Sequence, residues 1–557
     1  MATSETTEDR RFPTLTADQL AVVERRSGGA PATLTPGALA YAVGATDAPA
    51  WFIVAGTMDI FSHAGLDHER LIQTLGPGQF SGEINQLTGQ PTLAGGRAGA
   101  QGCQAVLLTA AQVRELVIGS ADIGEMVMRA FMLRRAALID AGSGGPILIG
   151  DPNSPDMVRL RGFLARNGFP HVVLDVSVDE RARAFVAQMQ PGGATLPLVV
   201  CADGSTLRCP DDAALAHCIG ISPTIDTDVV YDTAIIGAGP SGLAAAVYAA
   251  SEGLSVVVLE ANAIGGQAGA SARIENYLGF PSGISGQALA GRAFSQALKF
   301  GTKIALAQSV TALKSLTDER LTALTLSDGQ VIRARTTVVA SGARYRHPPL
   351  ANLKTFEGRG IAYWASPIEA RLCEGEEIAL VGGGNSAGQA VAFLAPRVKK
   401  LHLVIRRPDL TATMSRYLID RIASLPNVVL HASSEVSALE GDEVAGLDAV
   451  VLRHRKSGQD SRLALRHLFL FIGADPNTSW MDGCVETDSH GFIVTGAGMA
   501  AIPPPAGRLP LETSMSAVFA IGDVRAGSTK RIAAAVGEGA AVISQIHAAL
   551  AARSSAP

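Results

Sequence analysis

A strand, a glycine-rich turn and a helix are predicted around residues 237–242, and together they could bind a phosphate group. The segment YDTAIIGAGPSGLAAAVYAASEGLSVVVLE places Gly237, Gly239 and Gly242 in GxGxxG spacing. The first glycine permits a tight turn, the second lets a pyrophosphate approach the backbone, and the third lets the helix pack closely. Glu260 ends the next strand, where a carboxylate can accept hydrogen bonds from ribose hydroxyls. The complete pattern favours a dinucleotide site over a glycine-rich turn between packed elements.

A second fingerprint of the same kind follows the predicted strand EIALV. Gly382, Gly384 and Ala387 repeat the spacing, and the next strand, KLHLVI, is followed directly by Arg406 and Arg407 with no acid at its end. Two guanidinium groups at that position suit a 2′-phosphate, which favours NADPH over NADH. The alternative is a solvated arginine pair at a strand end.

Length and composition limit the class of protein in which these two turns could occur. A chain of 557 residues is too long for one core and predicts about two to four domains. The net charge of −5 gives no electrostatic reason to expect nucleic acid. The first residues, MATSETTEDRRF, lack the apolar core of a signal peptide, and no uninterrupted apolar run is long enough to cross a bilayer. We therefore expect a cytoplasmic protein with no membrane segment.

Six cysteines are scattered through the chain, and they form neither a CxxC pair nor a metal-ligand spacing. They lie at positions 103, 201, 209, 218, 373 and 484. In a reducing compartment, scattered thiols are expected to be packing residues. Cys201 and Cys209 flank a predicted hairpin and could face each other, although packing is favoured for them too.

Three segments must position the two turns. Residues 1–140 alternate short β-like runs with glycine-rich turns and end in a helical stretch. Residues 146–220 predict the order strand, helix, strand, helix, hairpin, helix. From about residue 228, a long glycine-rich α/β pattern runs to the end of the sequence.

The third segment resembles thioredoxin reductase of the low-molecular-weight flavoprotein type. Five ordered motifs carry the resemblance: GAGPSG, GGQ followed by ENYLGFP, VVASGARYR, LFLFIGADPNT, and VFAIGDVRAGSTKRIAAAVGEGAA. The resemblance implies an FAD-binding domain formed by residues 228–345 and 465–557. It also implies an inserted NAD(P)H-binding domain over 346–464, commonly within a homodimer. The segments Arg346–Pro348 and Gly473–Pro476 would be the hinges on which that domain rotates.

The same resemblance implies two sets of cofactor-binding residues. Asp523 would hold the ribityl chain of FAD, and Lys530, Arg531 and Ile532 would lie along the isoalloxazine ring. The FAD set comprises Gly237, Gly239, Pro240, Ser241, Gly242, Glu260, Gly266, Gln267, Asn276, Ser341, Gly342, Gly522, Asp523, Arg531 and Ile532. The NADPH set comprises Gly383, Gly384, Asn385, Ser386, Ala387, Arg406 and Arg407. Thr411 stands where the family often has a further arginine, and Arg416 could reach the phosphate instead.

The chain departs from the family at its redox-active thiol pair. The family motif YCATC is YWASP here, with Trp364 and Pro367 in place of both cysteines. Reduction of thioredoxin by the family mechanism is therefore not expected, and no catalytic residue is identified. Cys373 is the nearest thiol, but its mostly acidic surroundings do not favour a reactive thiolate, so we predict a structural role.

The first segment resembles the β-roll of cyclic nucleotide-binding domains. Gly82 and Glu83 of its phosphate-binding cassette are present, whereas Thr92 stands where the cassette has an arginine. Arg97 is offset by five positions and is expected to point elsewhere. Loss of the phosphate's charged partner favours a structural module without ligand over a cyclic-nucleotide sensor.

The second segment resembles a thioredoxin or glutaredoxin fold. Pro197 in TLPLVV would be the cis-proline of that fold. The position of the CPxC motif is occupied by DPNSPD, residues 151–156, which contains no thiol.

The predicted fold class is therefore multidomain α/β, with a β-roll, a thioredoxin-like fold and two Rossmann-like domains, the NADPH domain inserted in the FAD domain. The working hypothesis is an FAD-dependent NADPH oxidoreductase that passes electrons directly to an unidentified acceptor. That acceptor could be a small redox protein, a disulfide or a diffusible oxidant, since ferredoxin:NADP reductases on this scaffold also lack the cysteines. The alternative is a redox- or nucleotide-responsive regulatory or scaffold flavoprotein with little turnover.

Overall fold

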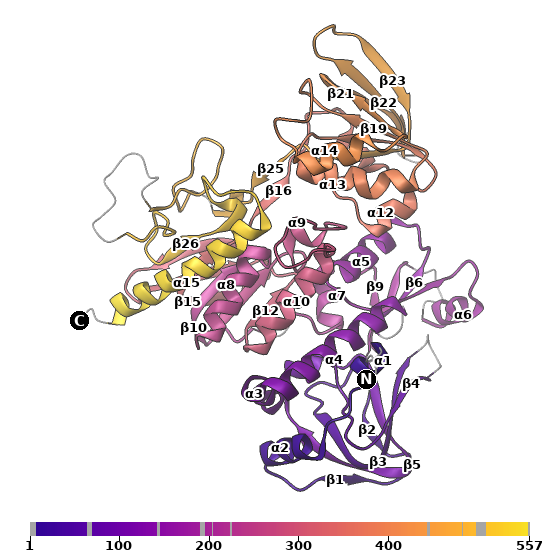
Figure 1. Cartoon of the computed structure of the whole chain (residues 1–557), viewed down its shortest axis with the longest axis vertical. Helices are drawn as coiled ribbons and strands as arrows, with labels where there is room; N and C mark the ends of the chain where they lie inside the picture. The colour runs from indigo at the N-terminus through magenta and orange to yellow at the C-terminus, as the bar shows by residue number, and fades with distance from the viewer. Residues whose placement is uncertain are drawn as a thin grey trace.

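A computed structural model shows an elongated chain in which several packed domains follow one another (Figure 1). The structure describes residues 7–63, 69–141, 145–189, 195–202, 204–222, 225–442, 446–481, 483–496 and 508–554.

The N-terminal domain is built on an antiparallel sheet of order β1-β5-β3-β4, with β2 paired to β5. Its strands are β1 (Ala32–Leu34), β2 (Leu39–Tyr41), β3 (Ala50–His63), β4 (Glu69–Leu75) and β5 (Gly95–Leu108). Its helices are α1 (Thr7–Arg11), α2 (Ala17–Ser27), the 3₁₀ turn η1 (Ile84–Leu87), α3 (Ala110–Gly119) and α4 (Ala121–Asp140). Phe131 of α4 packs edge-on against Phe80, which stacks on Phe52 of β3, so α4 covers the inner face of the sheet.

The second domain has a four-stranded sheet of order β7-β6-β8-β9. Its elements are β6 (Ile147–Gly150), α5 (Pro155–Arg166), β7 (Val172–Asp175), α6 (Glu180–Met189), β8 (Leu198–Val200), β9 (Thr206–Arg208) and α7 (Asp212–Cys218). The element order predicted for residues 146–220 is confirmed, and so is the cis peptide bond before Pro197.

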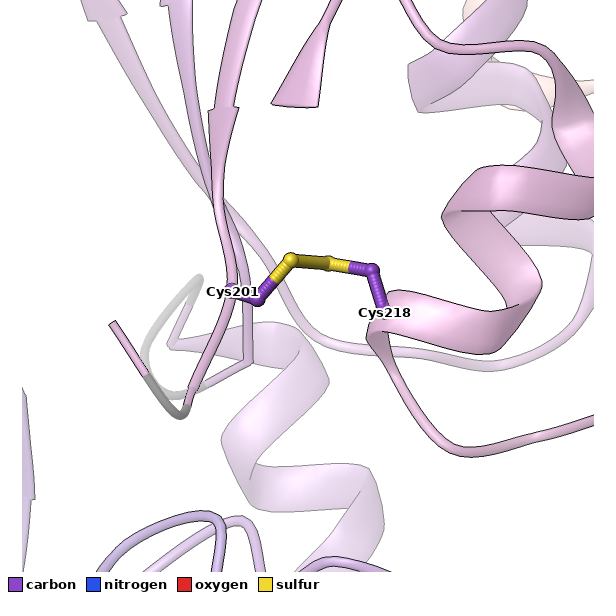
Figure 2. The surroundings of a disulfide bond; sticks show 2 residues. All are labelled: Cys201 and Cys218. Carbon is purple, nitrogen blue, oxygen red and sulfur yellow. A yellow bond between two sulfur atoms is a disulfide. The ribbon is translucent and has the colours of Figure 1, made fainter. Parts of the chain in front are cut away.

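The prediction that all six cysteines are unpaired packing residues is wrong for Cys201 and Cys218, which form a disulfide (Figure 2). Strand register explains why Cys209 is not the partner. The backbone N–H of Cys201 bonds to Ser205 at the closed end of the hairpin, whereas that of Cys209 bonds to Pro197 at its open end. Four strand residues, about 13 Å, therefore separate Cys201 from Cys209. The end of α7 brings Cys218 to Cys201 instead.

The third domain contains the first glycine fingerprint on a seven-stranded sheet of order β12-β11-β10-β15-β14-β13, with β26 paired to β15. Its strands are β10 (Val230–Ile236), β11 (Val256–Glu260), β12 (Lys303–Leu306), β13 (Val310–Leu316), β14 (Leu321–Leu326), β15 (Val331–Val339) and β26 (Val518–Ala520). Its helices are α8 (Pro240–Ser251), α9 (Gly266–Gly269), α10 (Gly286–Lys299) and α15 (Ile532–Ser554), with the 3₁₀ turns η3 (Ser479–Met481) and η5 (Gly522–Val524). Pairing of β15 with β26 brings the C-terminal part of the chain back into this domain.

The fourth domain contains the second fingerprint on a parallel sheet of order β17-β24-β18-β19-β20, beside a three-stranded sheet β21-β22-β23. Its strands are β17 (Ile361–Ala362), β18 (Glu377–Val381), β19 (Lys400–Val404), β20 (Val428–His431), β21 (Ser434–Asp442), β22 (Gly446–His454), β23 (Asp460–Ala464) and β24 (His467–Leu470). Its helices are α11 (Leu353–Phe356), α12 (Pro367–Leu372), α13 (Asn385–Leu394), η2 (Ala395–Arg397) and α14 (Arg416–Ala423). Two short antiparallel strands, β16 (Ala343–Tyr345) and β25 (Ala474–Pro476), connect it to the third domain (Figure 1).

Among the described residues, one helix meets the length and composition of a membrane span, over Ile532–Arg553. This differs from the expectation that no apolar stretch is long enough. The helix is α15, and it packs against α8. Val542, Ile543 and Ile546 of α15 are buried in the same core as α8. This packing buries one face of α15, and 28% of its apolar segment is buried in all.

Candidate functional site

Gly237 and Gly242 are required by the fold around the first fingerprint. Gly237 ends β10 with a φ of 106°, a region that side chains rarely adopt. A Cβ atom on Gly237 would overlap the carbonyl oxygen of Ala340, and one on Gly242 would overlap the carbonyl oxygen of Gly237. The first glycine therefore permits the turn, and the second permits close packing of α8.

Gly239 is different, because the fold itself does not require a glycine at this position. It is the N-cap of α8 with φ −72° and ψ −179°, which any residue can adopt. A Cβ atom there would have no neighbour within 4 Å. The free N–H groups and the positive end of the α8 dipole face this space, which suits a phosphate group.

Glu260 links the end of β11 to the same turn. Its Oε2 accepts a hydrogen bond of 2.7 Å from the backbone N–H of Ala238, and its Oε1 accepts one of 2.8 Å from Asn262. The side chain is buried, which raises the pKa of the carboxyl group, while these backbone bonds act in the opposite direction. Oε2 keeps a lone pair with which to accept a ribose hydroxyl.

Three segments far apart in the sequence meet at the N-terminus of α8. A Cβ atom on Gly266 would lie 3.2 Å from the Cα atom of Gly239, and one on Gly522 would overlap the Ser241 hydroxyl. The third segment includes Ser341, whose Cα atom lies against Gly237 and whose hydroxyl donates to Asn477 over 2.9 Å.

The remaining residues of the predicted FAD set lie around these segments. Gln267 donates its side-chain N–H to the carbonyl oxygen of Ala343, next to Gly342. Burial raises the pKa of the Asp523 carboxyl group, and Lys530, whose Nζ donates to the Asp523 carbonyl over 2.6 Å, lowers it. Pro240 is the first residue of α8. No described hydrogen bond joins Asn276, Arg531 or Ile532 to the turn; the first two are exposed.

In the second fingerprint, as in the first, one glycine is required by the fold and another has open space around it. Gly382 has a φ of 146°, and a Cβ atom there would overlap the carbonyl oxygen of Phe471. Gly384 is the N-cap of α13 with φ −95° and ψ 178°, and a Cβ atom on it would have no neighbour within 4 Å. Ala387 is buried against the sheet. The N-terminus of α13 therefore offers a second open phosphate position.

The flanking residues hold this second turn in place. The side-chain oxygen of Asn385 accepts the backbone N–H of Ser415 over 2.7 Å. The carbonyl oxygen of Gly383 accepts a hydrogen bond of 2.7 Å from the Thr413 hydroxyl. Ser386 is exposed on the first turn of α13.

Arg406 and Arg407 follow β19, and both are exposed. Among the described ion pairs neither has a carboxylate partner. Arg416, the other candidate for a phosphate contact, is paired with Asp420 at 2.8 Å on α14. Thr411 bonds locally to Asp409. The two adjacent arginines are therefore the cations that remain available beside the α13 turn.

A family model for pyridine nucleotide-disulphide oxidoreductases matches residues 231–539, more than half of the chain. The chain belongs to this family. The membership confirms the predicted cofactors, FAD and NADPH, and the open glycines at both helix N-termini fit them. It also confirms the Rossmann-like architecture of the third and fourth domains.

Curated relatives are similar over the same part of the chain. NADPH-dependent thioredoxin reductase 3 of Arabidopsis thaliana is 31% identical over 56% of this chain and 57% of its own length. The F component of alkyl hydroperoxide reductase from Escherichia coli is 32% identical over 56% of this chain and 56% of its own length. The chain thus matches little more than half the length of these relatives.

A crystal structure of Lactococcus lactis thioredoxin reductase, described as the FR conformation, has a TM-score of 0.52. It is 26% identical and covers 58% of this chain and 99% of that one. The family model begins at residue 231, so the two N-terminal domains lie outside it.

Trp364, which the sequence resemblance aligns with a thiol, contacts the second domain. Its indole N–H donates to Glu369 over 2.9 Å, and the guanidinium of Arg166, at the end of α5, lies 5.8 Å from the ring centre. Tyr345 lies 6.3 Å from the same ring. Pro367 is the first residue of α12. A cation–aromatic contact therefore joins Trp364 of the fourth domain to α5 of the second domain.

Arg166 and Asn167 are residues near the candidate site that sequence patterns missed. The side-chain oxygen of Asn167 accepts the backbone N–H of Ile264 over 3.2 Å, and its amide donates to Asn262 over 3.3 Å. These bonds fix the end of α5 beside the Glu260 turn. Nothing in the local sequence indicates this contact, because RNG at a helix end is an ordinary helix stop.

Thr92, Arg97 and Ser154 of the two N-terminal domains make local structural contacts. Thr92 is buried and donates its hydroxyl to the carbonyl of Ala42 over 2.8 Å. Arg97 pairs with Glu69 at 2.9 Å, which confirms that it points elsewhere. In DPNSPD, Ser154 caps α5 by accepting the backbone N–H of Met157.

Replacing Cys373 with alanine should leave NADPH-driven turnover unchanged. The thiol is fully buried, and burial raises its pKa to about 11, so almost none is thiolate at neutral pH. Loss of the sulfur should lower the free energy of unfolding by about 1 kcal/mol. Steady-state kinetics and urea unfolding of this variant would measure both effects. A stable variant that has lost its turnover would show that Cys373 takes part in the chemistry.

Proposed function

We propose that this protein is an NADPH-dependent FAD oxidoreductase that delivers electrons to its acceptor without a thiol pair in the NADPH domain. The supporting observation is the pair of open glycines, Gly239 and Gly384, each at the N-cap of a helix and neither required by the fold. Two such phosphate positions, each following a parallel strand, suit two dinucleotides. A scaffold protein that only held a flavin would have no need of the second.

The residues around each turn have distinct roles in this proposal. The N-terminus of α8 holds the pyrophosphate of FAD, Glu260 its ribose, and Asp523 its ribityl chain. The N-terminus of α13 holds the pyrophosphate of NADPH, with Arg406 and Arg407 on the 2′-phosphate. Bound FAD supplies two-electron chemistry between NADPH and the acceptor. The protein contributes orientation and charge.

Rotation of the NADPH domain is part of the proposal. The two expected hinge segments carry the paired strands β16 and β25, and Arg346 forms an ion pair with Asp475 at 2.6 Å beside them. Two contacts reach across to other domains: Arg421 with Glu275 at 3.1 Å, and Arg166 over Trp364. Both would break when the domain turns. The exposed ion pair adds little to the barrier, about 1 kcal/mol or less.

The domain limits and the wider setting remain proposals. We assign residues 1–140 to a cyclic nucleotide-binding-like domain and 146–220 to a thioredoxin-like domain. We assign 228–345 with 465–557 to the FAD domain and 346–464 to the NADPH domain. The antiparallel sheet covered by α4 and the β7-β6-β8-β9 sheet support the first two. The family resemblance supports a homodimer, which light scattering would test.

An anaerobic titration with NADPH, and separately with NADH, tests the central proposal. The flavin absorbance should bleach with about one equivalent of NADPH per FAD, because two electrons reduce one flavin. Ferricyanide, oxidised thioredoxin, a ferredoxin and a hydroperoxide would then be compared as acceptors. A flavin that stays oxidised with both nucleotides would contradict the proposal and favour a regulatory flavoprotein.

The Cys201–Cys218 disulfide supports a second candidate, in which the acceptor is internal. Reduction would break the S–S bond, and two electrons from NADPH with two protons would give two thiols. Disulfides in cytosolic proteins are usually transient, catalytic or redox-sensing. Against this candidate, Cys201 is buried, and the residues beside Cys218 include Pro91 and Leu93 of the N-terminal domain.

Replacing Cys201 and Cys218 together with alanine separates the two candidates. We expect reduction of the flavin by NADPH and turnover with ferricyanide to be unchanged, since neither requires the disulfide. The wild-type protein should take up about one equivalent of NADPH per FAD, whereas an internal acceptor predicts about two. The matched control is Cys209→Ala, because Cys209 is a free thiol of the same hairpin. An uptake of two equivalents that falls to one only in the double variant would establish the internal acceptor.

A further inference from the structure

The N-terminal domain contains a cavity of about 220 Å³ that is partly open to the surface. It lies between β3, β4, the segment Ser81–Gln86 and helix α4. Ile60, Ile72, Leu75 and Leu138 form an apolar wall, and Glu83, Arg134 and Ser62 are among its polar lining residues. A dry cavity of about 150 Å³ already admits benzene, so this one has room for a small organic ligand.

Arg134 of α4 is a buried cation without a counter-charge. Its Nε donates to the carbonyl of Arg11 over 2.9 Å, and its Nη1 donates to that of Gly82 over 2.8 Å. Its guanidinium lies 4.8 Å from the ring centre of Phe80. Nη2 is inaccessible and has no hydrogen-bond partner. No carboxylate among the described residues forms an ion pair with this arginine.

An unpaired buried charge is costly in a folded protein, and such groups normally find an opposite charge. Burial lowers the pKa of Arg134 to about 10, so the guanidinium remains charged at neutral pH. The neutral carbonyls and rings around it supply no negative charge. An anion bound in the cavity would supply that negative charge.

Glu83 is a buried anion that lacks hydrogen-bond donors. Its charge is matched by Arg135, whose Nη1 lies 3.6 Å from Oε2. Both carboxylate oxygens are inaccessible and neither has a hydrogen bond of good geometry, although the backbone N–H groups of Ile84 and Asn85 lower the pKa from nearby. The Ser62 hydroxyl is also buried without a partner. The carboxylate and the hydroxyl therefore lack the hydrogen bonds that buried polar groups normally make.

We propose that this cavity binds a small organic anion that carries hydroxyl groups, with Arg134 as its charge partner and Glu83 as the acceptor of its hydroxyls. Thr92 cannot supply the cation, because it is neutral and its hydroxyl is committed to Ala42. The anionic group is therefore placed beside α4 rather than at position 92. The cavity is smaller than most drug-sized pockets, about 300–1,000 Å³, which suits a ligand the size of a sugar phosphate or sugar acid.

Calorimetric titration of the full chain with ribose 5-phosphate, gluconate and inorganic phosphate tests the proposal. Ribose 5-phosphate and gluconate separate a phosphate from a carboxylate as the anionic group. Arg134→Gln should weaken binding about 100-fold, because a charge-assisted hydrogen bond and an ion pair are lost together. Glu83→Gln should reduce the preference for ribose 5-phosphate over inorganic phosphate. The matched control Arg129→Gln, at an exposed site on α4 paired with Glu125, should bind like the wild type.

Thermal unfolding with and without ligand distinguishes ligand binding from a purely structural role of Arg134. Arg134→Gln loses the hydrogen bonds to the carbonyls of Arg11 and Gly82, so its unfolding temperature without ligand should fall in either case. If the arginine serves as a charge partner, ribose 5-phosphate or gluconate should raise the unfolding temperature of the wild type but not that of Arg134→Gln. No heat of binding and no rise of the wild-type unfolding temperature with any probe would overturn the proposal. Binding of cyclic AMP with the same affinity in Arg134→Gln and wild type would overturn the assignment of Arg134.

Discussion

Replacing Gly239 with valine should give a folded protein that purifies without FAD. The backbone at Gly239 has angles that valine adopts readily, and a Cβ atom there meets no protein atom within 4 Å. The side chain would instead fill the space through which a pyrophosphate approaches the N-terminus of α8. We expect FAD affinity to fall at least about 100-fold, which corresponds to about 3 kcal/mol. The ratio of flavin to protein absorbance would measure the loss.

The matched control is Gly291→Val, because Gly291 also has open space around its Cα atom but lies in the middle of α10. It should retain FAD and unfold at the wild-type temperature, since valine is at least as favourable as glycine in a helix. Far-UV circular dichroism would show whether Gly239→Val is folded. A folded Gly239→Val protein that binds FAD normally would place the cofactor elsewhere and remove the main support for the proposed function.

The two nucleotide turns could be predicted from the sequence because their requirements are local. Gly237 and Gly382 must adopt positive φ, and the strand before each turn and the helix after it are adjacent in the chain. That the six cysteines form no CxxC spacing can also be read directly from the sequence, since it depends only on which residues are present. Neither inference needs knowledge of how distant segments pack.

Features that depend on distant segments were not predicted. The partner of Cys201 is set by the register of the β8–β9 hairpin and by the end of α7, and neither can be read from the local sequence alone. The contact of Arg166 with Trp364 joins residues from two domains. Arg134 lies 42 positions beyond Thr92, and its sequence neighbours give no sign that it enters the cavity. Burial of a charge can be recognised only from the packed structure.

Replacing Arg406 and Arg407 with serine should abolish the preference for NADPH over NADH. Each guanidinium is exposed and forms no described ion pair, so its removal should not disturb the fold. A hydrogen bond between charged groups contributes about 1.5–3 kcal/mol, so the double variant should lose about 10²- to 10⁴-fold in kcat/KM for NADPH. The value for NADH, which has no 2′-phosphate, should change little. Steady-state kinetics with ferricyanide would measure both.

The control for this variant is Arg416→Ser, because Arg416 is equally exposed but is paired with Asp420 on α14. It should keep the wild-type ratio of kcat/KM for NADPH to kcat/KM for NADH. Raising the salt concentration should weaken NADPH binding in the wild type and much less in the double variant, since exposed charges are screened. If the double variant keeps its NADPH preference, or if Arg416→Ser loses it, the 2′-phosphate site lies on α14 rather than at the end of β19. NADPH would then be recognised from a helix rather than from the strand end, and the absence of an acid after β19 would no longer explain the preference.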